Sequence, residues 1–319
     1  MSALVGVIAF VTIALSFGLT FMMRQISLAR GLIDVPNARS SHTIPTPRGG
    51  GVAIVLASIG AMCLLWFLGI VDRGLFMALV VGGLAVATIG FVDDRRPLSA
   101  RSRLIVHFAA AAWALAWLGW MPDAQLAGVL FIEKTAASLA AVFGIVWVLN
   151  LYNFMDGIDG IAAAEAVVVA WGGACLLLVA GHANGVVAAA IVFGAACGGF
   201  LLWNWPPAKI FMGDVGSGYL GYVIAVLALA ASRGSSASLW TWFILGGVFF
   251  VDATVTLIRR LLRGEPVYKA HRSHAYQWLA RSWRSHKLVT IAVTGTNLLW
   301  LLTAPSCRRS ILGGPCGSC

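Results

Sequence analysis

The sequence predicts an all-α, polytopic integral membrane protein. Of its 319 residues, 60% are hydrophobic and only 11% are charged, and the mean hydropathy is +0.89. Apolar stretches of about 20 residues, the length that an α-helix needs to cross a bilayer core of about 30 Å, recur along the chain. No segment between them is long enough for a separate soluble domain. We therefore expect a single transmembrane domain over residues 1–303.

We expect about ten membrane-spanning helices. Each is an apolar run bounded by charged or glycine- and proline-containing connections. The first run has neither a basic region before it nor a small-residue cleavage site after it, so it indicates a retained helix rather than a signal peptide. The predicted spans are residues 3–23, 50–70, 74–92, 104–121, 135–152, 161–180, 185–203, 215–232, 238–258 and 286–303.

The charges of the connections predict the orientation. With ten spans, the connections at 24–49, 93–103, 153–160, 204–214 and 259–285 lie on one side and, together with Lys287 at the edge of the last, hold 17 of the 22 Lys and Arg residues. The positive-inside rule makes that side cytoplasmic and places both termini outside. Nine of the twelve acidic residues lie in or near these connections. We therefore expect one active site, built from loops at the cytoplasmic face, and the net charge of +10 does not indicate a nucleic-acid partner.

One polar segment, NLYNFMDGIDGIAAAEA, stands out in this apolar chain. Its polar residues recur at a spacing of three: Asn150, Asn153, Asp156 and Asp159. Three such steps turn through about 180° on a helix, so one regular helix cannot aim all four at one target. Gly157 and Gly160 indicate a break, with the fifth span ending near Asn153 and both aspartates in an irregular connection. Capping of the next helix is the alternative, and it explains one residue only.

Two further acidic motifs adjoin predicted spans. Asp93 and Asp94 end the third span in FVDDRRPLSARSR. Adjacent like charges raise one pKa, which suits a general base or a shared cation, although an ion-pair loop with the following arginines is the alternative. Asp214 begins the eighth span in FMGDVGSG. It could cap that helix or hold a divalent cation while backbone N–H groups face phosphate.

Basic residues in the first and last cytoplasmic loops complete the set. Arg48 precedes three glycines in HTIPTPRGGG, and His271, Arg272 and His274 lie in YKAHRSHAYQ. Such residues bind phosphate or pyrophosphate, and the alternative for the arginines is contact with anionic lipid heads. Glu165 and Asp252 near span ends are functional candidates or partners of nearby arginines.

A surface site of carboxylates, an asparagine, histidines and arginines at the lipid boundary indicates a cation that holds phosphate groups. Oxygen ligands without cysteine favour Mg²⁺, with Mn²⁺ the alternative. Phosphoryl transfer from a nucleotide-linked donor to a lipid phosphate fits this location. The competing class is a secondary transporter, but transporter sites lie near the bilayer midplane, and these acidic residues lie at one edge.

The motifs DVPNARSSHTIPTPRGGG, FVDD, NLYNFMDGIDG, FMGDVGSG and HRSH, in this order, resemble the polyprenyl-phosphate N-acetylhexosamine-1-phosphate transferases, glycosyltransferase family 4. This family includes the phospho-MurNAc-pentapeptide translocase and initiators of cell-envelope polysaccharides. The segment AHRSHAYQ is more similar to the O-antigen initiating branch, the WbpL type, than to the translocase. The resemblance implies a bacterial inner-membrane enzyme that moves a sugar 1-phosphate from a UDP-N-acetylhexosamine to undecaprenyl phosphate and releases UMP. It also allows for a homodimer.

The resemblance implies a role for each motif. Asn153 and Asp214 match positions that hold Mg²⁺, and Asp93 and Asp94 match the acidic pair that deprotonates or orients the lipid phosphate. Asp156 and Asp159 match the nucleotide and metal loop. The loop over the sugar and pyrophosphate corresponds to His271, Arg272 and His274. The residues leave open the identity of the sugar and whether the lipid phosphate or a carboxylate attacks first.

The tail at residues 304–319, with its glycines and cysteines, looks unlike a terminus of this family, and no role is assigned to it.

Overall fold

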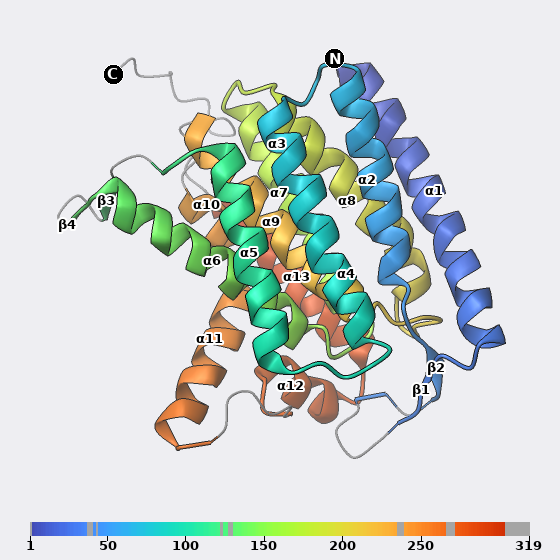
Figure 1. Cartoon of the computed structure of the whole chain (residues 1–319). Coiled ribbons are helices and arrows are strands. Elements are labelled where there is room, and N and C mark those ends of the chain that lie inside the picture. The colour runs from blue at the N-terminus through green and yellow to red at the C-terminus, as the bar shows by residue number, and fades with distance from the viewer. Residues whose placement is uncertain are drawn as a thin grey trace.

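The structure is a bundle of helices (Figure 1). The computed structural model describes residues 2–36, 41–42, 44–121, 124–126, 130–234, 239–265 and 272–303. Its helical elements are α1 (Ser2–Ala29), α2 (Gly51–Phe67), α3 (Arg73–Met77), the π-helical η1 (Ala78–Gly82), α4 (Gly83–Asp93), α5 (Ala100–Leu118), α6 (Lys134–Met155), α7 (Ile161–Val179), α8 (Gly185–Asn204), α9 (Asp214–Gly234), α10 (Leu239–Leu245), α11 (Gly247–Leu262), α12 (Ala275–Trp283) and α13 (His286–Thr303). Two short antiparallel hairpins join β1 (Ile33–Asp34) to β2 (Thr46–Pro47) and β3 (Ala124–Leu126) to β4 (Leu130–Ile132).

Six helical segments in the described part of the chain are long and apolar enough to cross a membrane. They are Ala3–Ala29, Arg73–Asp93, Lys134–Met155, Ile161–Val179, Gly185–Asn204 and Asp214–Arg233. The second of them is continuous through α3, η1 and α4. The prediction of a helical, multi-pass membrane protein is therefore confirmed. Helices also coincide with the predicted spans at α2, α5 and α13, but a total of ten crossing helices stays a prediction.

The predicted span at 238–258 is not one helix. It divides at Gly246 into α10 and α11, and α11 leaves the bundle at the lower left of Figure 1. Two adjacent glycines weaken the helix at this point. A Cβ on Gly247 would come within 2.2 Å of the Trp300 ring, so the missing side chain also makes room for α13. The short helix α12, which follows HRSH, has no counterpart among the predicted elements.

Helix α9 is the most enclosed of the spanning helices. Of its most apolar stretch, 89% lies buried, compared with 28% for α1. Glycines allow this close packing, as is usual between membrane helices. A Cβ on Gly51 of α2 would lie 2.4 Å from the Cα atom of Gly216, and one on Gly221 would lie 2.7 Å from that of Leu149 in α6. The N-terminus of α9, which carries Asp214, is therefore held tightly between its neighbours.

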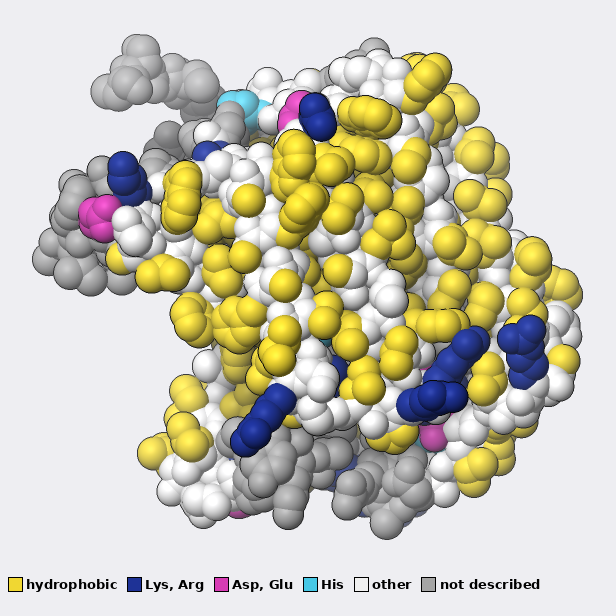
Figure 2. Space-filling model, viewed as in Figure 1, with side chains coloured by type: hydrophobic (Ala, Val, Ile, Leu, Met, Phe, Trp, Pro, Cys, Tyr) yellow, Lys and Arg dark blue, Asp and Glu magenta, His cyan; other side chains and the backbone are white. Residues whose placement is uncertain are grey.

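The surface agrees with a membrane location. Figure 2 shows hydrophobic side chains over the flank of the bundle, and Lys and Arg side chains mainly toward its two ends. The exposed large apolar residues include Val7, Phe10 and Val11 of α1 and Phe143 of α6. Lipid tails can cover such a surface without burying polar groups that lack a hydrogen-bond partner.

Candidate active site

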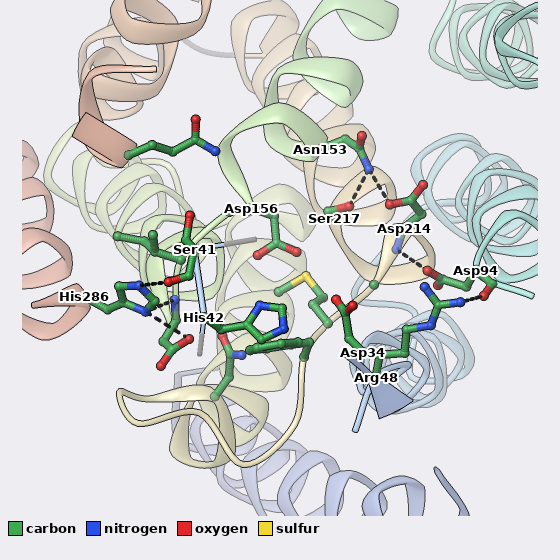
Figure 3. A pocket seen from close by; sticks show the side chains of 18 residues that line it. Asp34, Ser41, His42, Arg48, Asp94, Asn153, Asp156, Asp214, Ser217 and His286 are labelled. Carbon is green, nitrogen blue, oxygen red and sulfur yellow. Dashed lines mark hydrogen bonds and ion pairs between the residues drawn. The ribbon is translucent and has the colours of Figure 1, made fainter. Parts of the chain in front are cut away.

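A polar pocket lies at one end of the bundle, where α6, α9 and α13 meet the loops around β2 and α4 (Figure 3). Its volume is about 260 Å³. Six of the predicted site residues line it: Arg48, Asp94, Asn153, Asp156, Asp159 and Asp214. The structure therefore brings together residues from the first, second, third and fourth predicted cytoplasmic loops.

Asp214 and Asn153 form one wall of the pocket. Asp214 is the first residue of α9, after Gly213 in a left-handed conformation with φ of 78°. The Asn153 Nδ2 atom donates to Asp214 Oδ1 at 2.9 Å and to Ser217 Oγ at 3.0 Å. Helix α6 continues two residues past the predicted end, to Met155, so Asn153 lies on regular helix. Its amide group thereby fixes the orientation of the Asp214 carboxylate.

Asp94 caps the same end of α9 from the neighbouring helix. Its two carboxylate oxygens accept the backbone N–H groups of Asp214 and Val215 at 3.0 and 3.1 Å. Arg48 in turn donates to the Asp94 carbonyl oxygen. Burial raises the pKa of the Asp94 carboxyl group, although the two backbone hydrogen bonds and the Arg48 charge act in the opposite direction. Asp94 therefore orders the start of α9, where helix N-terminal N–H groups need acceptors.

Asp93 does not line this pocket. It pairs with Arg103 at 2.8 Å and accepts the Leu98 N–H group at 2.6 Å. The neighbouring Arg95 instead lies over the Phe91 ring, with its guanidinium carbon 3.9 Å from the ring centre. The two adjacent aspartates thus have different partners, and the charge of Asp93 contributes least to the raised pKa of Asp94.

A smaller recess of about 20 Å³ lies on the other side of Asp214 and Asn153. Arg103, His107 and Asn150 line it together with apolar residues of α4, α6 and α9. Arg103 also lies 3.3 Å from Asp214 Oδ2. Asn150 donates to the carbonyl oxygen of Val146 in its own helix and lines this recess rather than the main pocket. Asp214 and Asn153 are consequently shared by a basic recess and an acidic pocket.

The two aspartates of the GID loop differ in their surroundings. Asp156 follows α6 and, within the described part of the chain, its side chain has no hydrogen bond or ion pair. Burial, together with repulsion from Asp214, Asp94 and Asp159, raises the pKa of Asp156 to about 7. In Figure 3 its carboxyl group lies between the Asp214 wall and His286. Asp156 is therefore the carboxyl group best placed to meet a bound cation or phosphate.

Asp159 is held firmly in place. His286 Nδ1 lies 3.2 Å from Asp159 Oδ1, and the Ala208 N–H group donates to Oδ2 at 3.0 Å. Burial raises the pKa of Asp159, but the hydrogen bonds from His286 and Ala208 outweigh it, so this pKa lies below its ordinary value. Gly160, with φ of 76°, completes the turn into α7. As expected, the four polar residues at spacing three do not share one face.

The last loop differs from its prediction. Among the described residues, Asp252 of α11 pairs with no arginine: its carboxylate accepts the N–H groups of Ala275 and Tyr276, both at 2.9 Å, and lies 3.3 Å from His274 Nδ1. It therefore caps α12. His274 is only 2% exposed and does not line the pocket. Arg272 is exposed, and its carbonyl oxygen accepts hydrogen bonds from Arg281. His271 lies outside the described residues.

The sequence patterns did not predict several residues that line the pocket. Gln277 of α12 and His286 of α13 take the place expected for the histidine loop. Asp34 and His42 come from the first loop, and the His42 ring meets the Phe211 ring edge-on at 4.8 Å. His42 begins the motif HTIPTPRGGG, so a signal was present. His286 had none, because it is the first residue of an apolar span.

The donor set fits Mg²⁺. No group of three or more His, Cys, Asp and Glu side chains among the described residues is arranged to hold a metal ion by itself. Mg²⁺, however, is usually bound by one or two carboxylates together with water and substrate phosphates. Asp214 and Asp156 supply carboxylates, and the repulsion from Asp214, which helps to raise the pKa of Asp156, would be relieved by a bound cation.

The contact between α4 and α9 gives a first testable expectation. A Cβ on Gly90 would lie 2.5 Å from the Asp214 carbonyl oxygen and 2.7 Å from the Val215 nitrogen. These are backbone atoms, so Gly90→Ala should displace the start of α9 and lower the free energy of unfolding by about 1–3 kcal/mol. Thermal unfolding in detergent and enzyme assays measure both effects. Gly60→Ala, where nothing lies within 4 Å of the new Cβ, is the matched control. Equal stability of the two variants would contradict this packing.

Comparisons with known proteins indicate the family of this chain. Residues 76–232 match the model of glycosyl transferase family 4. The chain is 29% identical over 291 residues, 90% of its length and 80% of the relative, to the probable undecaprenyl-phosphate N-acetylglucosaminyl 1-phosphate transferase of Bacillus subtilis. It is 28% identical to the decaprenyl-phosphate N-acetylglucosaminephosphotransferase of Mycobacterium tuberculosis, over 98% of this chain and 83% of that protein.

A third relative, the phospho-N-acetylmuramoyl-pentapeptide-transferase of Endomicrobium trichonymphae, is 31% identical over 74% of this chain and 73% of its own length. The protein is thus a membrane-bound transferase. It belongs to glycosyl transferase family 4, in the group of polyprenyl-phosphate N-acetylhexosamine-1-phosphate transferases.

Proposed function

We propose that this protein transfers an N-acetylhexosamine 1-phosphate from a UDP-sugar to undecaprenyl phosphate and releases UMP. The observation that carries this proposal is the combination of groups in one pocket: Asp214, Asp156 and Arg48 all line the cavity of about 260 Å³. Two phosphate-bearing substrates can react only where they meet, and this pocket offers them carboxylates that can hold a cation and an arginine that can bind phosphate. The named relatives are polyprenyl-phosphate sugar-phosphate transferases, which supports the same reaction class.

The proposed chemistry forms one P–O bond and breaks another. An oxygen of the lipid phosphate attacks the β-phosphorus of the UDP-sugar. The bond from that phosphorus to the bridging oxygen breaks, and UMP leaves with the electron pair. When bound, Mg²⁺ would neutralise charge on the pyrophosphate oxygens. Attack by a carboxylate first, with a covalent intermediate, is the alternative course.

The residues divide these tasks. Arg48 lines the pocket and would hold a substrate phosphate there, whereas Arg103 pairs with Asp93 and Asp214 from the small recess. Asp214 and Asp156 would hold the cation, and Asn153 would orient Asp214. Asp156 has no hydrogen-bond or ion-pair partner among the residues that the structure describes, and it is therefore the candidate to accept a proton or to act as nucleophile. Asp93, Asp94 and Asp159 are held by other groups and would act as positioning residues.

An experiment can distinguish two classes of sugar donor. The relatives include both N-acetylglucosamine-phosphate and phospho-MurNAc-pentapeptide transferases. The first membrane step of O-antigen or a related envelope polysaccharide is the role we favour, because AHRSHAYQ is similar to that branch. A secondary transporter is disfavoured because the carboxylates of the pocket gather at one end of the bundle.

The direct test incubates membranes that contain the protein with undecaprenyl phosphate and radiolabelled UDP-sugars. The panel holds UDP-GlcNAc, UDP-GalNAc, UDP-N-acetylfucosamine, UDP-N-acetylquinovosamine and UDP-MurNAc-pentapeptide. We expect label from one N-acetylhexosamine in the lipid phase, and none in membranes that carry Asp214→Asn. Label from UDP-MurNAc-pentapeptide alone would identify a translocase. Uptake of label into vesicles without a product lipid would instead support a transporter.

The proposed orientation places the pocket at the cytoplasmic face of a bacterial inner membrane. In a background without the native cysteines, Arg96→Cys should be protected from a membrane-impermeant maleimide in intact cells, whereas Ala183→Cys should react. Both positions are exposed in the structure. Permeabilised cells should label both. The reverse pattern in intact cells would overturn the orientation.

A further inference from the structure

A buried polar pair lies inside the bundle, away from the pocket. Glu165 of α7 is 1% exposed and Asn297 of α13 is 0% exposed. The Asn297 Nδ2 atom donates to Glu165 Oε2. The remaining oxygens, Glu165 Oε1 and Asn297 Oδ1, are both buried without a hydrogen-bond partner. No ion pair in the described part of the chain involves Glu165.

A single hydrogen accounts for both unpartnered oxygens. An ionised carboxylate without a cation is very costly inside a membrane protein. If Glu165 Oε1 carries a proton, it becomes a donor and can bond to Asn297 Oδ1. The carboxyl and amide groups then form two reciprocal hydrogen bonds, and no polar group of the pair is left unsatisfied. The Tyr152 hydroxyl group is also buried and has no hydrogen-bond partner. It therefore does not donate to Glu165 Oε1 and cannot take the place of this proton.

The pair belongs to a series of contacts that leads to the pocket. His286, Thr290 and Asn297 lie at spacings of four and seven residues, and therefore on one face of α13. Thr290 Oγ1 donates to the Asp159 carbonyl oxygen at 2.9 Å, and His286 Nδ1 lies 3.2 Å from the Asp159 carboxylate. On the other side, Asp159 and Glu165 flank the first turn of α7. The contacts of α13 at Asp159 and at Glu165 therefore both oppose a shift of α13 along α7.

We propose that Glu165 is a protonated carboxyl group paired with Asn297, and that this pair fixes the register of α13 on α7 and so positions His286 against Asp159 at the pocket. A slip by one helical turn, about 5.4 Å, would carry His286 out of reach of Asp159. Glu165 and Asn297 are positioning residues, because neither lines the pocket. The kinetic part of the test rests on the proposed function.

The variants separate charge from shape. Glu165→Gln keeps the size and both hydrogen bonds of the neutral acid, so kcat/KM should change little. Glu165→Leu and Asn297→Leu should each lower kcat/KM by about 10–100-fold, because small misplacements of a site residue have effects of this size. Thr296→Val is the matched control, since within the described ranges the Thr296 hydroxyl donates only to the Ala292 carbonyl oxygen of its own helix. A loss in Glu165→Gln as large as in Glu165→Leu would overturn the neutral pair.

A double-mutant cycle tests the path through His286. His286→Ala alone should reduce kcat/KM, and adding Asn297→Leu should reduce it little further, because the two changes remove the same positioning effect. Full additivity of the two losses would show that the pair does not act through His286.

Infrared spectroscopy tests the protonation without any assay. The C=O stretching band of a protonated carboxyl group should be present in the wild-type protein at about pH 9, where Asp156 with its pKa of about 7 has lost its proton, and it should be absent from Glu165→Gln at the same pH. If the wild-type protein transfers no sugar phosphate but shows this band, the proposed function fails while the buried pair stands. Absence of the band from the wild type would overturn the pair whatever the activity.

Discussion

Transfer activity should fall by about 10²–10³-fold in the Asp214→Asn protein, a loss typical of removing one stabilising group from an active site. The replacement keeps the size of the side chain but removes the charge that faces the pocket and Arg103 at 3.3 Å. The backbone of α9 should be undisturbed, because Asp94 caps it through main-chain N–H groups. The protein should therefore insert and fold normally. Initial rates of lipid-phase labelling, with thermal unfolding in detergent, measure both properties.

Asn153→Ala tests the second residue of the same wall of the pocket. It removes the donor that orients Asp214, and losses of about 10–100-fold are usual for such supporting groups. Asp72→Asn is the matched control, because Asp72 caps α3 outside the pocket and asparagine caps helices as well as aspartate does. Wild-type rates in Asp214→Asn would remove this residue from the mechanism.

Removal of divalent cations should abolish activity, and Mg²⁺ or Mn²⁺ should restore it. The reason is electrostatic: the pocket gathers Asp94, Asp156, Asp159 and Asp214, and two phosphate-bearing substrates add further negative charge. EDTA titration followed by metal addition, with initial rates as the readout, tests this expectation. Undiminished transfer in EDTA would contradict a metal-dependent mechanism.

Metal-free protein should also show a characteristic pH dependence of stability. Because the folded pKa of Asp156 is raised to about 7, the folded state retains a proton that the unfolded state releases between about pH 4 and pH 7. The contribution of Asp156 should therefore lower the free energy of unfolding as the pH rises through this window. Asp156→Asn should remove that part of the slope, and thermal unfolding in EDTA at several pH values measures it. An unchanged slope in the variant would contradict the burial of this carboxyl group.

Much of the pocket could be predicted from local sequence patterns. Asn153, Asp156, Asp159 and Asp214 stand out because polar residues are rare and costly in an apolar chain. The division of labour among them did not follow from the pattern. Asp156 and Asp159 are three residues apart, yet Asp156 has no partner in the described part of the chain, whereas Asp159 is held by His286 and Ala208. Those partners lie 127 and 49 residues away along the chain.

Charged residues near span ends were harder to interpret. Asp252 and Glu165 were functional candidates, and pairing with arginines close in sequence was the alternative. The structure instead pairs Asp252 with the N-terminus of α12 and Glu165 with Asn297. A helix terminus or an amide group can satisfy a carboxyl group as well as an arginine can, and nothing in the local sequence distinguishes them.

The sequence by itself determined the class of structure, since apolar runs of membrane-spanning length can satisfy their backbone groups in lipid only as helices or closed barrels. It also determined which polar side chains gather at one end, because loop charge follows membrane orientation. Only the tertiary structure decided the break at Gly246, the burial of His274 and the entry of His286 into the pocket. These features depend on which helix faces meet, and residues far apart in the chain set that contact.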